Sequence, residues 1–428
     1  MVKNVGSVVR WQVAKLALVQ GMQAMSSAFF TCGVVFTGAA SSDSLGLALV
    51  LMFKTLPTLV MAFLGGVLAD RLPRKTLASG MLGGLAISYG VGTWVVQLSG
   101  LGWPVQAISL AAGIIGAVGS PALFALLPSI APPEDIVRAN GLIRTFRNAG
   151  SVVGPLLGAW LAQLISPSFL FLDGAVCLAV SMPLVLSLKL MPSCDDEANN
   201  NDDDASMISA LRSIPSLFHT YIWLAVGVPF WALFLAVQSG ATDVTMPLWV
   251  VQESGRGAWS LMASITSSGY ICGSLIALKL ERPRHMFSKS VLFGALAIMP
   301  IFVVGTLDIQ VLWYVASFVA GLGLELSGVF WGSTMQTCVD KQHMGRVSSI
   351  DYAISFGLIP LAYGLYGFTG TIHAAVVLTV SSSIMIVLVI IVFPFCYLID
   401  HRSNSSGIIN SSDAVSYTHL TLPTICSV

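Results

Sequence analysis

The chain has 428 residues, of which 55% are hydrophobic and 9% are charged, and its formal net charge is zero. With a mean hydropathy of +0.84, it lacks the charged surface of a soluble protein, and nothing in its charge balance indicates binding to nucleic acid. Its apolar runs are long and continuous. They predict an all-α polytopic membrane protein, since a transmembrane β-barrel would show short alternating segments instead.

Twelve apolar segments of about 20 residues or more are each long enough to cross a bilayer. They fall at roughly 12–39, 45–67, 76–97, 105–129, 143–165, 170–191, 221–250, 259–278, 290–309, 311–332, 349–369 and 373–398. Lys3, Arg10 and Lys15 precede an apolar run from about Leu16 to Ala40, so a cleaved signal peptide is the alternative interpretation of the first segment. That segment is longer than the apolar region of a signal peptide, and its removal would leave an odd number of spans.

The connections between these segments differ in charge according to the side on which they fall. On one side they contain a single cation, Arg256. The other side carries Arg71, Arg74, Lys75, Arg138, Lys189, Arg212, Lys279, Arg282, Arg284, Lys289, Lys341, Arg346 and Arg402. Lys and Arg accumulate in cytoplasmic loops, so we expect both termini in the cytoplasm and the chain in a plasma or inner membrane.

The chain divides into four regions by composition. Residues 1–191 and 218–400 each hold six apolar segments, and 192–217 is an acidic, Asn-rich connection that is typical of a flexible cytoplasmic linker. Residues 401–428 form a polar tail, whose last part, 415–428, resembles translated sequencing-adapter sequence and is given no function. The scattered, odd-numbered cysteines contain no Cys-x-x-Cys pair, so neither a disulfide framework nor a zinc site is predicted.

A charged turn separates the second and third apolar segments. It contains the pattern Gly-x-x-x-Asp-Arg-x-x-Arg-Lys, formed by Gly66, Asp70, Arg71, Arg74 and Lys75. The pattern resembles the loop between the second and third helices of major facilitator superfamily transporters, although that family usually has Gly where this chain has Pro73. A fainter copy, at 277–285, places Pro283 and Arg284 210 residues after Pro73 and Arg74. The resemblance therefore implies two related six-helix bundles, with a full motif only in the first.

Motifs for ATP use or hydrolysis are missing from the sequence. It contains no G-x-x-x-x-G-K-[ST], H-E-x-x-H or G-x-S-x-G, and its six His residues are dispersed. A membrane-embedded enzyme is therefore disfavoured. We expect no cofactor or metal, and the remaining energy source for transport is an ion gradient.

The fifth apolar segment carries a glycine pattern. Gly150, Gly154 and Gly158 lie on one helical face, which allows close approach of a neighbouring backbone, and Pro155 bends the helix. The run resembles the Gly-x-x-x-Gly-Pro-x-x-Gly signature of proton-coupled exporters in the superfamily, and so implies efflux. Arg144 and Arg147 precede it by one to two turns. They either extend to the cytoplasmic surface or line a cavity where they contact substrate or a carboxylate.

Lys54, Asp173, Asp243 and Glu325 are ionisable residues inside apolar segments. Lys54, Asp173 and Asp243 are expected in the outer half of the membrane, where an unpaired charge costs about 2.5–3.5 kcal/mol near the centre. We hypothesise that Lys54 pairs with Asp173 or Asp243 when the outer side is closed. The alternative is that the two carboxylates cap helix ends. Glu325 lies deep in the tenth segment, where a low dielectric suits a group that binds and releases protons, or where it makes a structural hydrogen bond.

The start of the eleventh segment is polar. Arg346, Ser348, Ser349 and Asp351 either cap the helix or complete a gate. In the superfamily, the carboxylate of the first charged turn docks here. By that resemblance Asp70 would lie near Ser348 and Ser349, and Arg71 or Arg74 would pair with Asp351, in one conformational state only.

Further motifs resemble the superfamily branch of enterobactin and macrolide exporters. They are Ser120-Pro121 to Leu127-Pro128, Arg138-Ala-Asn140, Gly154-Pro155, Leu172-Asp173-Gly-Ala, Trp331 to Gln336, Gly345 to Ser348, and Pro360. The likeness covers about 12–398 and implies bulky amphipathic substrates. Cavity candidates are Gln20, Gln23, Trp231, Gln238, Trp331 and Gln336, for which helix packing is the alternative.

These observations predict a monomeric secondary transporter of twelve helices in two bundles. It would export a small organic molecule in exchange for protons by alternating access. Uptake or symport is the alternative within transport. A non-transporting membrane sensor or scaffold on the same fold is the alternative outside it, although a scaffold would gain nothing from intramembrane charges.

Overall fold

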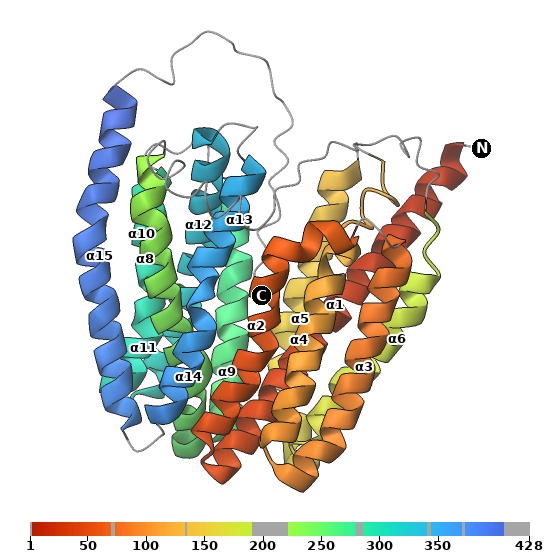
Figure 1. Cartoon of the computed structure of the whole chain (residues 1–428), viewed down its shortest axis with the longest axis horizontal. Coiled ribbons are helices and arrows are strands. Elements are labelled where there is room, and N and C mark those ends of the chain that lie inside the picture. The colour runs from red at the N-terminus through yellow and green to blue at the C-terminus, as the bar shows by residue number, and fades with distance from the viewer. Residues whose placement is uncertain are drawn as a thin grey trace. The chain divides into compact units, whose positions relative to one another are not determined.

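A computed structural model describes residues 2–69, 73–132, 135–190, 221–279, 286–339, 344–369 and 373–405. These residues are almost entirely helical, which confirms the predicted fold class (Figure 1). In the first half the helices are α1 (Val2–Ser41), α2 (Ser44–Ala69), α3 (Arg74–Ser99), α4 (Trp103–Phe124), α5 (Ile136–Leu164) and α6 (Phe169–Leu186). Each corresponds to one predicted span, and the sixth, like the fourth, ends five residues before its predicted boundary. The fourth ends five residues before the predicted boundary, because Pro128 disfavours helical backbone before it.

The second half contains the remaining elements. They are α8 (Ile222–Ser239), η2 (Gly240–Thr245), α9 (Met246–Ala277), α10 (Met286–Gly294), η3 (Ala295–Ala297), α11 (Ile298–Thr306), α12 (Gln310–Cys338), α13 (Met344–Gly357), α14 (Ile359–Thr369) and α15 (Ala374–Ser405). Several predicted spans are thus built from two consecutive pieces. The eleventh, for example, is α13 followed by α14, and the two meet at a turn before Pro360.

Eight helices among the described residues are long and apolar enough to cross a membrane. One of these, Ile222–Ala277, runs for 56 residues, and a straight helix of that length would measure about 84 Å. The bilayer core is only about 30 Å thick. The backbone breaks at Gly255, whose φ of 84° and ψ of 169° are accessible to glycine and strained for other residues. Gly255 therefore divides this stretch into the two predicted spans.

The chain forms two compact units, each built from several segments of the sequence. Unit 1 comprises the described residues of Met1–Ile208, Ser239–Ser264 and Ile359–Ala374, and unit 2 those of Ser209–Gln238, Ile265–Leu358 and Ala375–Val428. In unit 1, α1 packs on α5 and α6, α2 on α4, and α3 on α4 and α6. Within the same unit, α14 packs on both α2 and η2. In unit 2, α12 packs on α10 and α11.

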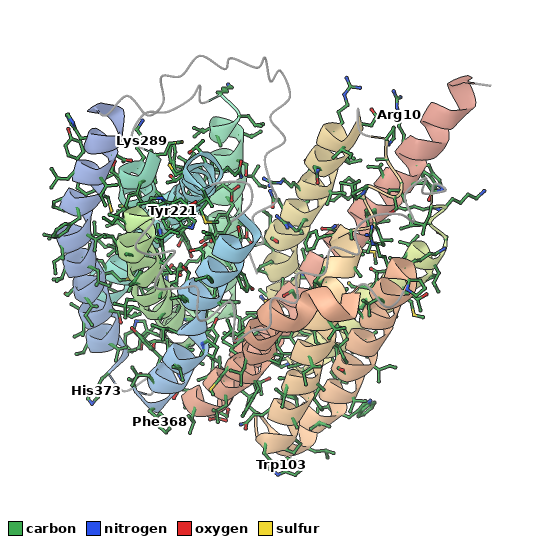
Figure 2. All side chains as sticks on the ribbon, turned by 45° about the horizontal axis from the view of Figure 1, so that its top comes forward. Arg10, Trp103, Tyr221, Lys289, Phe368 and His373 are labelled. Carbon is green, nitrogen blue, oxygen red and sulfur yellow. The ribbon has the colours of Figure 1, made fainter. Side chains whose placement is uncertain are left out.

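The two ends of unit 1 differ in character. Arg10 lies at one end, and Trp103 and Phe368 lie at the other (Figure 2). At the Arg10 end, the Lys75 ammonium donates to the Leu188 carbonyl (2.9 Å), and the Lys15 ammonium donates to Ser187 (2.9 Å). These bonds occupy backbone and side-chain acceptors just after α6.

Candidate functional site

Lys54 is a half-buried cation in the middle of α2. Its ammonium lies 3.8 Å from the centroid of the Phe30 ring and 5.8 Å from that of Tyr89. The two rings stack at 4.8 Å, and Phe171 meets Phe30 edge-on at 5.2 Å. No described residue gives this ammonium a hydrogen-bond acceptor or an acidic partner. Cation–π attraction is the compensation that unit 1 provides for this charge.

Asp173 lies in α6, the helix that also contributes Phe171 to this aromatic group. The next residue, Gly174, accepts a hydrogen bond from Ser26 (2.9 Å) at a point where a Cβ would lie 3.3 Å from the Tyr89 ring. The Asp173 Oδ2 atom is buried and has no hydrogen-bond partner among the described residues. The hypothesised Lys54–Asp173 ion pair is therefore not formed in this structure. Asp173 does not cap α6 either, because it lies beyond the first turn.

Asp243 lies in η2, a single π-helical turn between α8 and α9. Its Oδ2 accepts a hydrogen bond from the Tyr363 hydroxyl of α14 (2.8 Å), and its Oδ1 accepts a longer one from Thr242 (3.3 Å). It neither pairs with Lys54 nor caps a helix, because helical backbone continues on both sides of it. Single π turns are frequent at functional sites.

Several contacts within unit 1 join segments that are distant in sequence. Arg256 donates to the Ala162 carbonyl of α5 (2.6 Å) and lies 5.6 Å from the centroid of the Phe36 ring. Ser264 donates to the Val152 carbonyl (2.8 Å). Further bonds join Gln252 to Ser42 (3.2 Å) and Ser44 to the Gly367 carbonyl (2.9 Å). The one cation on the side predicted to lie outside is thus bound to the end of α5, a role that we did not predict.

The glycine face of α5 is packed closely on α1. A Cβ at Gly150 would overlap the Gly21 carbonyl oxygen. One at Gly154 would lie 2.6 Å from the Ala28 Cβ, and one at Gly158 would lie 3.0 Å from the Cys32 Sγ. Pro155 is buried within the helix. The predicted close approach of a neighbouring backbone is therefore present, and the neighbour is α1.

Glu325 in unit 2 is half-buried in α12. Its Oε1 accepts a hydrogen bond from Ser274 of α9 (2.7 Å), at a point where a Cβ on Gly273 would lie 2.9 Å from the Glu325 Cβ. The structure thus contains the interhelical hydrogen bond of the structural alternative. A carboxyl that binds a proton can make the same bond, so the contact is compatible with both interpretations.

Asp351 is buried in α13, seven residues after the helix begins. It is not an N-cap. Its Oδ2 accepts the indole N–H of Trp331 (3.1 Å), and its Oδ1 accepts the hydroxyl of Ser355 (3.1 Å). Trp331 in turn packs among Trp223, Trp231 and Phe287, with ring centroids 5.5–6.2 Å from its own. Trp331 and Trp231, two of the cavity candidates, are therefore mainly packed against other rings.

The remaining site candidates fall into two groups. Outside the described residues or their described side chains are Gly66, Asp70, Arg71, Arg346 and Ser349. Two of the others are exposed, Arg74 at the start of α3 and Gln336. The rest are half-buried: Ser348, Arg144, Arg147 and Gln23. The predicted docking of Asp70 at Ser348 and Ser349 therefore falls outside what the structure describes.

Two units of long apolar helices, with charged side chains held inside them, define a multi-pass membrane protein. The Major Facilitator Superfamily model matches residues 16–362, so the chain belongs to this family of membrane transporters. A curated relative is the uncharacterized MFS-type transporter YceJ of Bacillus subtilis, which is 24% identical over 316 residues, covering 72% of this chain and 75% of YceJ.

Solved transporters share the fold. The nucleoside transporter NupG superimposes with a TM-score of 0.72 at 14% identity, covering 91% of this chain and 99% of NupG. A D-xylose–proton symporter gives a TM-score of 0.61 at 12% identity, covering 88% of this chain and 97% of the symporter. At these identities the likeness is one of fold alone.

Proposed function

We propose that this membrane transporter exports a small amphipathic organic molecule, of the drug, macrolide or siderophore type, in exchange for protons. In this proposal the described helices belong to two six-helix bundles, 1–191 and 218–400, joined by the linker 192–217. The bundles expose a central site to alternate sides of the membrane. The protein acts as a monomer in the plasma or inner membrane, with both termini in the cytoplasm.

One observation carries the proposal of ion-coupled transport. Lys54, Asp173 and Asp243 lie inside apolar helices, and none of the three makes an ion pair with a described residue. An intramembrane charge without an opposite partner is costly, and such residues mark ion and substrate pathways. A sensor or scaffold would gain nothing from this cost. The proton is also the coupling ion named for the D-xylose symporter that shares the fold.

The direction of transport rests on α5. Its Gly150–Gly158 face fits α1 closely, and Pro155 lies in the same stretch of the helix. Uptake is the second candidate, since NupG carries nucleosides and the symporter carries a sugar on the same fold. On the cytoplasmic side, Asp70 is proposed to dock at Ser348 and Ser349. If Arg71 or Arg74 binds Asp351 there, it must compete with Trp331 and Ser355.

Accumulation of a fluorescent dye and of a macrolide panel, in cells with and without the protein, tests the proposal. We expect lower accumulation in cells that contain the protein, and an uncoupler should abolish the difference. Higher accumulation would favour uptake, and equal accumulation of every compound would favour a scaffold.

The same assay tests Glu325 as a coupling residue. A Glu325→Gln protein should lose concentrative export, whereas Glu253→Gln, which changes an exposed carboxylate of α9, should retain it. Export against a gradient by Glu325→Gln would remove Glu325 from the mechanism.

A further inference from the structure

Asp243 differs from the other intramembrane carboxylates in the element that holds it. Each α-helical residue advances the helix by about 100°, and a π turn inserts one extra residue. In η2, Ala241, Val244 and Thr245 are buried, while Thr242 and Asp243 are half-buried. Asp243 is thus the one carboxylate of this turn, and the residue remains partly exposed.

The partner of Asp243 is a tyrosine on a helix with two packed faces. Tyr363 donates to Asp243, and three residues later the Tyr366 ring lies where a Cβ on Gly240 of η2 would have to be. The adjoining face of α14 bears Gly364 and Gly367. A Cβ at Gly367 would lie 2.5 Å from the Ala48 Cβ of α2, and one at Gly364 would lie 3.8 Å from the Met52 Sδ. Thus α14 is fixed to η2 by tyrosines and to α2 by glycines.

No cation compensates the Asp243 carboxylate among the residues that the structure describes. The elements packed on η2 are α14 and α2. From α14 the titratable groups are Tyr363 and Tyr366, and from α2 the candidate is Lys54, whose ammonium lies over Phe30 instead. An ionised carboxylate in such surroundings is costly, whereas a protonated one keeps its hydrogen bonds at little cost.

We propose that Asp243 is a proton-binding site of this transporter, and that Tyr363 links its protonation to the packing of α14 on α2. The inference rests on the proposed proton-coupled function. Protonation permits η2, α14 and α2 to remain packed together at the end predicted to be outside. Loss of the proton favours hydration of Asp243, which requires this end to open. The carboxyl O–H bond forms when a proton binds in one step of the transport cycle and breaks when that proton leaves in another. No other reactant is consumed.

A cross-link at the predicted outer end tests this without a known substrate. Gln252 and Ser42 are exposed, and their polar atoms are 3.2 Å apart. In a background without reactive native cysteines, a Ser42→Cys/Gln252→Cys pair is treated with a short bifunctional methanethiosulfonate at several pH values. A Lys15→Cys/Ser187→Cys pair, whose native polar atoms are 2.9 Å apart at the other end of unit 1, corrects for thiol reactivity.

After that correction, we expect the yield of the Ser42→Cys/Gln252→Cys cross-link to fall by about fivefold or more as the pH rises. A change of this size is typical of allosteric coupling between two sites. In Asp243→Asn the yield should stay at its acidic level at every pH. Tyr363→Phe should lower it even at acidic pH, because α14 loses its bond to η2. Asp308→Asn, the same change at an exposed position, should behave like the parent protein.

Three outcomes would overturn the inference. They are a parent protein without pH dependence, an Asp243→Asn protein that keeps it, and a response that Glu325→Gln removes while Asp243→Asn does not. Elution of each variant as a monodisperse species in detergent excludes misfolding as the cause. The accumulation assay reports separately on function, so a response that depends on Asp243 without any uncoupler-sensitive export would contradict the proposed function instead.

Discussion

Lys54 shows that a charged residue with a defined contact inside the protein can still indicate function. Its ammonium is compensated by aromatic faces and not by a carboxylate of the described residues. Cation–π contacts contribute about 0.5–2 kcal/mol, less than the roughly 2.5–3.5 kcal/mol that an unpaired charge costs near the bilayer centre. The native residue is therefore expected to reduce stability, which a transporter tolerates only in return for activity.

Replacing Lys54 with Met tests this balance. Lys54→Met keeps an unbranched side chain and removes the charge, so the midpoint of thermal unfolding in detergent should stay equal or rise while uncoupler-sensitive export falls. Lys54→Arg keeps the charge and should retain part of the export. A Lys54→Met protein that is clearly less stable would instead show that the cation–π contact is structural.

A second residue-scale prediction concerns the indole of Trp331. Its N–H binds the Asp351 carboxylate, so Trp331→Phe should destabilise the protein by about 1–3 kcal/mol because a buried acceptor loses its donor. Trp223 provides a matched control in the same ring cluster, because its N–H is buried without a partner among the described residues. Trp223→Phe should cost less. Equal losses in the unfolding midpoint would mean that ring packing, and not the hydrogen bond, sets the stability.

At the scale of elements, the α1–α5 contact depends on small residues. In Gly150→Ala the new methyl group would overlap the Gly21 carbonyl, so the helices must separate. We expect a loss of about 1–3 kcal/mol, typical of overpacking, with lower folded yield and weaker export. Gly141→Ala on the same helix enters open space and should be neutral or slightly stabilising. Fluorescence-detected size exclusion and thermal unfolding measure both.

The sequence predicts the helices better than it predicts which side chains contact one another. Apolar length predicts where the helices lie, because the bilayer fixes the length of a crossing helix, and eight helices among the described residues are long and apolar enough to cross. The glycine spacing on α5 predicts a tight contact, since small residues at intervals of four share one face. By contrast, the π turn at Asp243 and the break at Gly255 leave no periodic signal. They are set by tertiary packing of η2 on α14 and by one glycine among many.

Side-chain partners were harder to predict for a related reason. The sequence predicts an acidic partner for Lys54, because charge is the strongest signal in an apolar sequence, yet the structure compensates it with Phe30 and Tyr89. Asp351 is predicted as a cap or gate residue, but it binds an indole 20 residues earlier in the chain. Arg256 is the single cation in the connections on its side, and this position indicates a specific contact.

At the scale of the whole molecule, the topology depends on the stretch Ile222–Ala277. If Gly255 reverses its direction, Lys279 and Arg10 lie on one side of the membrane, and Asp308 and His373 lie on the other. If it does not, every later loop changes sides. The charge distribution supports reversal, since Lys279 precedes a second basic turn while Asp308 and His373 lie in connections that contain no Lys or Arg.

Labelling of single cysteines decides between these topologies. Arg10, Lys279, Asp308 and His373 are exposed, so a cysteine at each should react once a reagent reaches its side. With a membrane-impermeant maleimide on intact cells, we expect Asp308→Cys and His373→Cys to react, and Arg10→Cys and Lys279→Cys to react only after permeabilisation. Reaction of Lys279→Cys in intact cells, with Arg10→Cys protected, would mean an odd number of crossings before it. The proposed position of Asp243 and α14 together at the outer end would then be wrong, because η2 and α14 could not both lie near the outside.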